Sequence, residues 1–417
     1  MGVQIDCYSL TINQIIIRRF CRLAKEKEKK ALKRGRASFN LIGRVKLTDR
    51  TFNLNNTYDS GWTDNGMYVG IDCGEGNLVY AEMKSGFFPD RDNTIYAYSK
   101  DEKDEKGMSK SVQIAWEDRF DESLLDTISD SSFLTVGVEK DVKDKTVYKK
   151  FLTAYDAVEY LNEHLEDGMV VNVRGNLKYS QYEENVSVRK EITSIALSKA
   201  EEDSYKATFT QTLLVGKKAF GKPDKEKNVI PFDAFVVDYV GNVKVDGEKV
   251  AIKQNISFPK SFELNNEDPE LSAKLIKKFF DPKKGYYNEV TVAGKLVEGG
   301  SVVMITDDDI PDDIKELIEM GAYSEEEAKS KMAVGNNNRE RRMVVVKPEI
   351  VYVGDAENRK PTIAFEPDKY EDDDLVFYEQ SLMEAMGSDG SSDEVPFDEK
   401  SSDSDEDDEL MKMLENM

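Results

Sequence analysis

One stretch, residues 169–197, constrains the fold of this chain more than any other. Every second position from 171 to 179 is apolar or glycine, and the positions between them are polar or basic. This alternation is typical of a strand with one buried face, and Gly175 lies in register with that face. A glycine there indicates a bulge or sharp bend, which a small closed barrel needs. Residues 179–185 are predicted to form a turn, and residues 186–197 a second strand.

The same pattern returns later in the chain. Val290, Val292, Gly294 and Leu296 repeat Val171, Val173, Gly175 and Leu177 at an offset of 119. The partner strand returns at an offset of 158, with Val346, Glu349, Ile350 and Val353 matching Val188, Glu191, Ile192 and Ile195. Helical spacing precedes each copy, at residues 147–165 and 271–280. A helix followed by two strands, found twice, predicts a duplicated domain with a longer loop in the second copy.

The order of the predicted elements defines the expected fold. Each unit contains five strands with one helix between the third and the fourth, which is the order of an OB-fold. We therefore expect a mainly β chain with minor α content, built from tandem OB-like five-stranded β-barrels. The expected boundaries are a basic arm at 1–37, one OB-like domain at 38–200, a second at 201–365, and a disordered acidic tail at 366–417. Another small β-barrel or sandwich is the alternative.

The net charge of −24 is unevenly distributed. Residues 1–37 hold ten basic against three acidic residues, whereas residues 366–417 hold twenty acidic residues against three lysines. The rest of the chain is acidic too. Binding to a polyanion remains compatible with this balance, because it depends on the local potential in a groove rather than on the sum over the surface.

Few residues suit catalysis or metal binding. His164 is the one histidine and falls on a predicted helix surface, and three cysteines cannot complete a zinc site with it. The sequence has no phosphate-binding GxxxxGK[ST] loop and no apolar run long enough to span a membrane. We therefore expect a cytoplasmic binding protein with no enzymatic activity, metal or cofactor, and no membrane contact.

Single-stranded nucleic acid is held by aromatic rings along a basic groove. In an OB barrel this groove lies over the second and third strands. The candidate residues in the first unit are Trp62, Tyr68, Tyr80, Arg174, Lys178, Tyr179, Tyr182, Arg189 and Lys190. Those in the second are Lys217, Lys218, Phe220, Lys222 and Lys253, with Arg339, Arg341 and Arg342 near the returning loop. A single ring among these is expected more often in the core than as a stacking platform, but Tyr179 and Tyr182 are expected in an exposed loop.

The acidic tail ends in the apolar residues Leu410, Met411, Met413 and Leu414. OB-like barrels followed by such a tail resemble the single-stranded-DNA-binding proteins of replication, especially those of bacteriophages. The resemblance covers about residues 38–365 and 366–417, and it implies sequence-independent binding and protection of single-stranded DNA in replication, recombination and repair. It also implies recruitment of a polymerase, helicase or primase through the tail tip. A tip rich in Leu and Met, instead of the Pro-Phe end of the bacterial family, leaves the partner and the oligomeric state open. The alternative is a β-barrel interaction or regulatory protein that acts on a host polymerase or another protein partner.

Overall fold

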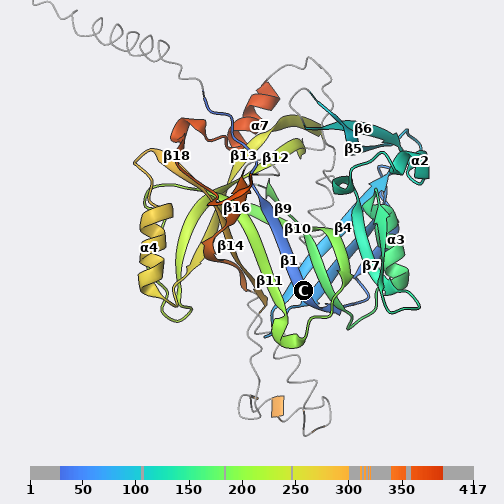
Figure 1. The fold of residues 1–417 in the computed structure, drawn as a ribbon, viewed down its shortest axis with the longest axis horizontal. Helices are drawn as coiled ribbons and strands as arrows, with labels where there is room; N and C mark the ends of the chain where they lie inside the picture. Colours follow the sequence, from blue (N-terminus) through green and yellow to red (C-terminus); the bar gives the residue numbers. More distant parts are fainter. Residues whose placement is uncertain are drawn as a thin grey trace, which may run out of the picture.

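The computed structural model describes residues 29–104, 108–182, 185–245, 248–299, 340–353 and 358–387, with a few positions between 310 and 320. These residues form a mainly β structure with few helices, as expected (Figure 1). No helix within these ranges is both long and apolar enough to cross a membrane. Most strands join one 14-stranded sheet.

Five strands of the first half pair in a closed circuit. They are β1 (Ala37–Lys46), β3 (Thr63–Asp72), β4 (Leu78–Phe87), β10 (Asn185–Leu197) and β9 (Val170–Tyr182). Each pairs with the next, and β9 returns to β1. The β4–β10 pairing is parallel and the other four are antiparallel. The helix α3 (Ala154–His164) lies between β4 and β9 in the chain and begins at Thr153, whose side chain accepts a hydrogen bond from the Asp156 N–H.

The second half repeats this circuit. Its strands, in pairing order, are β11 (Lys206–Val215), β12 (Val229–Val245), β13 (Glu248–Asn265), β15 (Glu340–Pro348) and β14 (Tyr286–Gly299). The circuit closes through β14 and β11. As in the first circuit, the third and fifth strands in chain order, here β13 and β15, are parallel. The helix α4 (Pro269–Phe279) lies between the third and fourth strands, with Asp268 capping its N-terminus.

The predicted equivalence of Gly175 and Gly294 is confirmed. Gly175 pairs with Phe39 of β1, and Gly294 pairs with Phe209 of β11. A Cβ on either glycine would lie within 2.7 Å of the phenylalanine ring that faces it. Both glycines also lie beside an irregularity in the ladder to the fifth strand, as the sequence pattern predicted.

Two details of the predicted repeat are wrong. Gly175 pairs with Ile192 and Gly294 with Val345, so the partner strands are offset by 153 positions (345 − 192) instead of 158. Ile350 and Val353 instead belong to β16 (Ile350–Val353), which pairs with β17 (Lys360–Ile363). The first predicted helix also begins too early, because Val147 and Phe151 lie in β8 (Thr146–Phe151), paired with β7 (Leu134–Lys140). Val147 and Phe151 are four residues apart, a spacing that fits one face of a helix and one face of a strand. The pairing of β8 with β7 decides for the strand.

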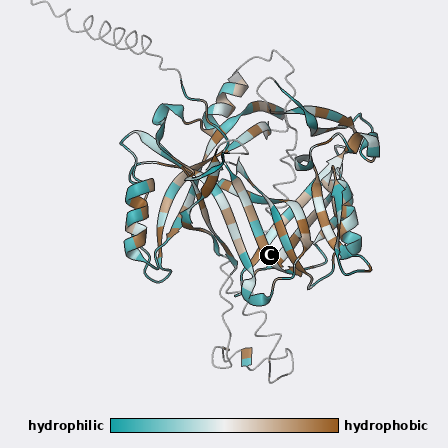
Figure 2. Cartoon of the chain, viewed as in Figure 1, coloured by the Kyte–Doolittle hydropathy of each residue, from teal (hydrophilic) through white to brown (hydrophobic). Residues whose placement is uncertain are grey.

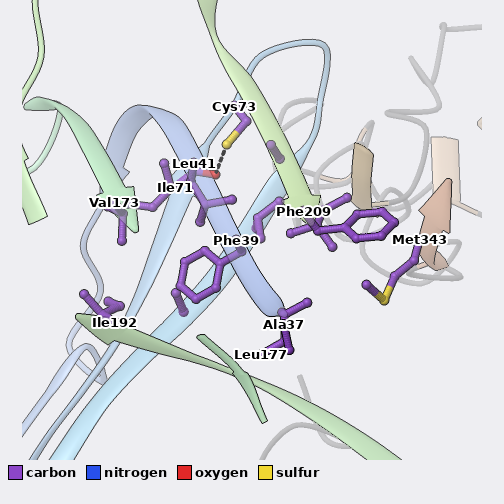
Figure 3. Close-up of a cluster of buried hydrophobic side chains, with 14 of the residues drawn as sticks. Ala37, Phe39, Leu41, Ile71, Cys73, Val173, Leu177, Ile192, Phe209 and Met343 are labelled. Carbon is purple, nitrogen blue, oxygen red and sulfur yellow. Dashed lines mark hydrogen bonds between the residues drawn. The ribbon is translucent and has the colours of Figure 1, made fainter. Parts of the chain in front are cut away.

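An antiparallel ladder joins the two circuits. β1 pairs with β11 from Ala37↔Gln211 to Ile42↔Lys206, and Phe39 lies opposite Phe209. The buried side chains of both circuits form one continuous core, to which Figure 3 shows Phe39 and Phe209 contributing. Phe39 packs toward Gly175 and Phe209 toward Gly294. Along the strands, apolar and polar residues alternate as a sheet buried on one face requires (Figure 2).

Smaller elements extend this frame. The hairpin of β5 (Thr94–Lys103) and β6 (Ser109–Ala115) has its own small core, and β2 (Phe52–Thr57) pairs with β3. β18 (Phe365–Glu371) pairs with β14, and α7 (Tyr378–Gly387) packs on β13. Short helical turns lie at Trp116–Asp118, Glu122–Leu125, Asp130–Ser132, Glu202–Ser204 and Asp372–Asp374.

The terminal segments of the described chain are not free arms. Residues 29–36 lie against the second circuit, where the Arg34 Nε is 2.7 Å from Asp238 and the Leu32 carbonyl accepts a hydrogen bond from Asn255. Residues 366–387 were expected to belong to a disordered tail, but they are folded here because Tyr370 and Leu375 are buried against the same circuit. Residues 1–28 and 388–417 lie outside the described part.

Candidate nucleic-acid interface

Two aromatic pairs mark the outer face of β3 and β4. Met67, Val69 and Ile71 of β3 point into the core, so Tyr68 points outward. On β4, Val79 and Ala81 are buried and Tyr80 points outward. The Tyr68 and Tyr80 rings stack with centroids 4.9 Å apart and planes 7° apart. Both rings are half-buried and stand on the strands that the sequence predicted.

The second pair lies at the other end of the same face. Trp62 contacts Phe88 edge-on, with ring centroids 4.9 Å apart, and the Arg91 guanidinium lies 4.3 Å from the Phe88 ring centroid. Tyr68 is paired with Glu82, and Trp62 precedes the position paired with Phe87. The two aromatic pairs, which we call stations, are thus six residues apart along the β3 segment, from Trp62 to Tyr68, or roughly 20 Å at the rise of a strand.

Between the two stations, a buried carboxylate fixes a basic group. Asp64 is fully buried, and its Oδ2 accepts a hydrogen bond from the Trp62 indole at 3.2 Å and lies 3.4 Å from the Lys84 Nζ. The Lys84 Nζ also donates to the Tyr58 hydroxyl at 3.3 Å. Opposite Lys84 stands Gly66, and the lysine stem lies in ordinary contact with the position of a Cβ there. Asp64 therefore orients both Trp62 and Lys84.

β10 borders this face beside β4. The Arg189 Nε lies 3.8 Å from Glu82, and the second circuit repeats this pair with Arg342 and Glu263 at 2.9 Å. Lys190 turns to the seam between the circuits, where its Nζ lies 2.6 Å from Glu298 of β14. Both side chains of that pair are about nine-tenths buried. The structure therefore brings Trp62, Tyr68, Tyr80, Arg189 and Lys190 to one region.

Other predicted residues lie elsewhere. Tyr179 was expected in a loop, but it stands within β9 at 5% exposure, donates its hydroxyl to Gln211 at 3.0 Å, and cannot present its ring to a base. Burial raises the pKa of this hydroxyl, with Asp238 adding to the effect. Tyr182, at the end of β9, is 65% exposed. Arg174 and Lys178 lie on the outer face of β9, which β10 separates from β4.

The basic loop of the second circuit lies beside α4 instead of on the β3–β4 face. The Lys217 Nζ is 2.5 Å from Asp281, just after that helix, while Lys218 and Lys222 are exposed. The Phe220 ring packs on Phe232, so it serves the core. Lys253 is exposed on the long β12–β13 hairpin, beyond the closed circuit. Arg339 and the tip residues Leu410, Met411, Met413 and Leu414 lie outside the described residues.

The aromatic face is not duplicated. The strand registers make Pro231 and Ser261 of the second circuit equivalent to Tyr68 and Tyr80. The Ser261 hydroxyl donates a hydrogen bond to the carboxylate of Asp233 on the neighbouring strand β12 at 2.7 Å. A stacking site of this kind is therefore a property of the first circuit, and the second offers a polar, acidic surface there.

Sequence reasoning missed Lys84, Phe88 and Arg91. Lys84 follows Tyr80 and Glu82 at the period of a strand, so the alternation could have indicated it. Phe88 and Arg91 lie just past the strand end, where no periodicity applies. No group of three or more His, Cys, Asp or Glu in the described chain is arranged to hold a metal ion.

Comparison with known proteins gives one family match. A family model described as YorF matches residues 98–332, which is more than half of the chain. No curated protein matches the sequence significantly. The single-stranded DNA binding protein from Thermus aquaticus aligns over 64% of this chain and 87% of its own, with 12% identity and a TM-score of 0.28. A deletion mutant of it aligns over 64% and 89%, with 12% identity and a TM-score of 0.27. Because TM-scores this low do not establish a common fold, the functional conclusion depends on the chain's own geometry.

Proposed function

The chain belongs to the YorF family, and from its geometry we propose that it binds single-stranded DNA without sequence preference. The binding surface is the outer face of β3 and β4. The observation that carries this proposal is the parallel stack of Tyr68 and Tyr80, two half-buried rings on that face. The outer side of such a stack offers a platform to a base, and every base has a π-face, so stacking tolerates any sequence.

The strand pairings support an OB-like barrel for each circuit. In both, the pairing order is first, second, third, fifth, fourth and back to first, with a helix between the third and fourth strands. OB-folds bind oligonucleotides on the face of their second and third strands. In the first circuit these strands are β3 and β4, which carry the aromatic stations.

The charged groups on the face suit a nucleic-acid backbone. Lys84 lies between the two aromatic stations, and Arg91 and Arg189 lie at the borders of the β3–β4 face. A single-stranded DNA that crosses the face from Trp62 to Tyr80 would place its phosphates near these basic groups while its bases stack on the rings. Glu82 and Asp64 balance part of this charge and hold Arg189 and Lys84 in position.

The biological role that we propose is coating and protection of single-stranded DNA during replication, recombination and repair, of the bacteriophage type. The acidic segment at 388–417 recruits a polymerase, helicase or primase through its apolar tip. The protein acts without catalysis, since stacking and charge need no reacting group. Truncation after residue 387, followed by a pull-down of replication proteins, tests recruitment, and an unchanged set of recovered proteins contradicts it.

An electrophoretic shift with oligo-dT and with duplex DNA at two salt concentrations tests the binding. We expect binding to the single strand, weakened by salt. Tyr80→Ala should raise the Kd about 5- to 150-fold, since a base stack is worth roughly 1–3 kcal/mol. Tyr80→Phe keeps the ring and should bind as the wild type does. Tyr148→Ala removes another exposed tyrosine, on β8, and serves as the control. Equal affinities of Tyr80→Ala and Tyr148→Ala would refute the platform.

One observation favours a second candidate function, interaction with a protein partner. The β16–β17 hairpin leaves Ile350 61% exposed, Tyr352 67% and Val353 53%. Replacing Ile350 and Tyr352 with Ser leaves DNA binding intact under the first function and removes a protein partner under the second. Loss of DNA binding in that variant would show that the hairpin serves the nucleic acid instead.

A further inference from the structure

We propose that the end of the second circuit that faces the first is a phosphate-binding site, formed by Lys260 and Arg341 around Glu298. This inference rests on the proposed function, because the phosphate belongs to the DNA strand that leaves the Tyr68–Tyr80 stack. Lys260 stands on β13, Arg341 on β15 and Glu298 on β14. The site thus combines three strands of the second circuit with the aromatic face of the first.

The strand registers place these three side chains in one row. Glu298 is paired directly with Arg341 in the β14–β15 ladder. Glu263 is paired with Val344 in the parallel β13–β15 ladder, and three residues back along both strands Lys260 lies level with Arg341. Side chains at paired positions lie on the same side of a sheet, about 5 Å apart at Cβ.

The row continues the inward-facing side of the circuit. Two residues farther along each strand stand Phe262, Met343 and Leu296, and all three are buried in the core. At the period of a strand, the charged residues therefore point to the same side as these core residues. The apolar interior ends here in a charged mouth, which is a usual place for a ligand site in a barrel.

The first circuit closes one side of this mouth. The Lys190 Nζ lies 2.6 Å from the Glu298 carboxylate. The Glu298 N–H donates to the Asn77 Oδ1 at 2.8 Å, and the Asn77 amide donates to the Leu296 carbonyl at 2.9 Å. These bonds fix Glu298 against the turn between β3 and β4, next to the aromatic face.

The charges of the described side chains at this mouth are unbalanced. Lys190, Lys260 and Arg341 are three basic groups beside one carboxylate, Glu298, and of the three only Lys190 lies within ion-pair distance of it. No ion pair with another described residue neutralises Lys260 or Arg341. Burial lowers the pKa of Lys260, and the neighbouring Lys190 and Arg341 lower it further against the opposing effect of Glu298. An anion bound here would relieve the repulsion among Lys190, Lys260 and Arg341. In a nucleic acid the anionic group is the phosphate, which Lys and Arg side chains bind.

Tyr68 connects the mouth to the stack. Burial raises the pKa of its hydroxyl, and of the charges that act on it Arg341 lowers this pKa while Glu298 and Glu82 raise it. The strand registers agree, because Tyr68 is paired with Glu82, Glu82 is paired with Glu191, and the adjacent Lys190 binds Glu298. The ring that stacks on Tyr80 therefore lies beside the charged mouth. A strand with a base on this stack has its backbone within reach of Lys260 and Arg341.

Two arms test the site. In the first, the dependence of oligo-dT binding on salt is compared for the wild type, Lys260→Gln and Lys277→Gln, the last on exposed α4. One phosphate contact on a single strand contributes a slope of about −0.7. Lys260→Gln should flatten the slope by about that amount, so that between 50 and 200 mM salt it loses about 2.6-fold less affinity than the wild type. Lys277→Gln should keep the wild-type slope.

The second arm uses inorganic pyrophosphate and needs no DNA. Millimolar pyrophosphate should raise the Tm of the wild type and of Lys277→Gln, because a ligand that binds the folded state stabilises it. Lys260→Gln should lose this shift. A shift that depends on Lys260 without any oligo-dT binding supports the anion site and refutes the proposed function. Equal slopes and equal shifts in the two variants refute the site, whatever the wild type does with DNA.

Discussion

The duplicated fold can be tested by replacing Gly175, opposite Phe39, or Gly294, opposite Phe209, with alanine. A Cβ on Gly175 would lie 1.9 Å from the Glu191 carbonyl oxygen and 2.7 Å from the Phe39 ring. A Cβ on Gly294 would lie 2.3 Å from the Val344 oxygen and 2.5 Å from the Phe209 ring. Ordinary contact begins near 3.4 Å, so the strands must separate by about 1 Å or more.

Overpacking of this kind costs about 1–3 kcal/mol, and the upper end applies because one obstacle is backbone and cannot rotate away. Gly66→Ala is the matched control, since the nearest atom to its Cβ would be Lys84 Cγ at an ordinary 3.6 Å. An alanine in a strand is favoured over glycine by roughly 0.5–1 kcal/mol, so this variant should be neutral or slightly more stable. The expected gap between Gly175→Ala and Gly66→Ala is therefore about 3–4 kcal/mol, the overpacking cost plus the gain of the control.

Urea unfolding measures this gap as a shift in midpoint. The two tryptophans, Trp62 and Trp116, both lie in the first half of the chain and report on it by fluorescence, while circular dichroism follows both halves. Gly175→Ala should lower the fluorescence midpoint, and Gly294→Ala should lower the dichroism midpoint similarly. If Gly175→Ala and Gly66→Ala unfold at the same urea concentration, the close approach described for Gly175 is wrong.

Three further predictions concern buried polar groups. Tyr179→Phe should lower stability by about 1–3 kcal/mol in urea unfolding, because Gln211 loses its buried donor, and it should leave oligo-dT affinity unchanged. Arg34→Gln should cost a similar amount by the same assay, since Asp238 is 2% exposed and keeps only backbone donors. Burial lowers the pKa of Lys260, so at this group the unfolded chain binds more protons above that pKa, and its contribution to stability should rise with pH up to about 10.4. Lys260→Met removes this contribution, so the stability of the wild type relative to Lys260→Met should rise with pH over that range, and a difference that stays constant would contradict it.

The sequence predicted the repeated frame well because that frame depends on local alternation. Gly175 and Gly294 lie in register with apolar residues, and both face a phenylalanine of the first strand as a tight corner requires. The partner-strand offset failed because Ile350 and Val353 have the same β propensity as Val344 and Val345. Only the pairing with β14 distinguishes β15 from β16.

The candidate site was predictable only in part. Tyr68 and Tyr80 follow the strand period, so their outward direction could be inferred from buried neighbours. Tyr179 failed because its strand continues to Tyr182, three residues beyond Tyr179 and into the expected turn, and its ring fills the core. Lys260 could not be found, because a lysine at an inward position gives no sign that the core ends there. The position of the charged mouth depends on the contact of Glu298 with Lys190 and Asn77 of the first circuit, which only the structure shows.

The β1–β11 ladder also determines when the edge of the first circuit becomes covered during synthesis. The first circuit is fully made at Leu197, yet residues 37–42 of β1 then have one open edge until β11 follows at 206–215. At about 5–20 residues per second this interval lasts roughly 1–4 s. The strand that covers the edge is the next one translated, so the edge is exposed only briefly to other nascent chains. A fragment ending at residue 200 would keep that edge open and could pair β1 with β1 of a second copy, with Phe39 opposite Phe39, which its mass in solution would reveal.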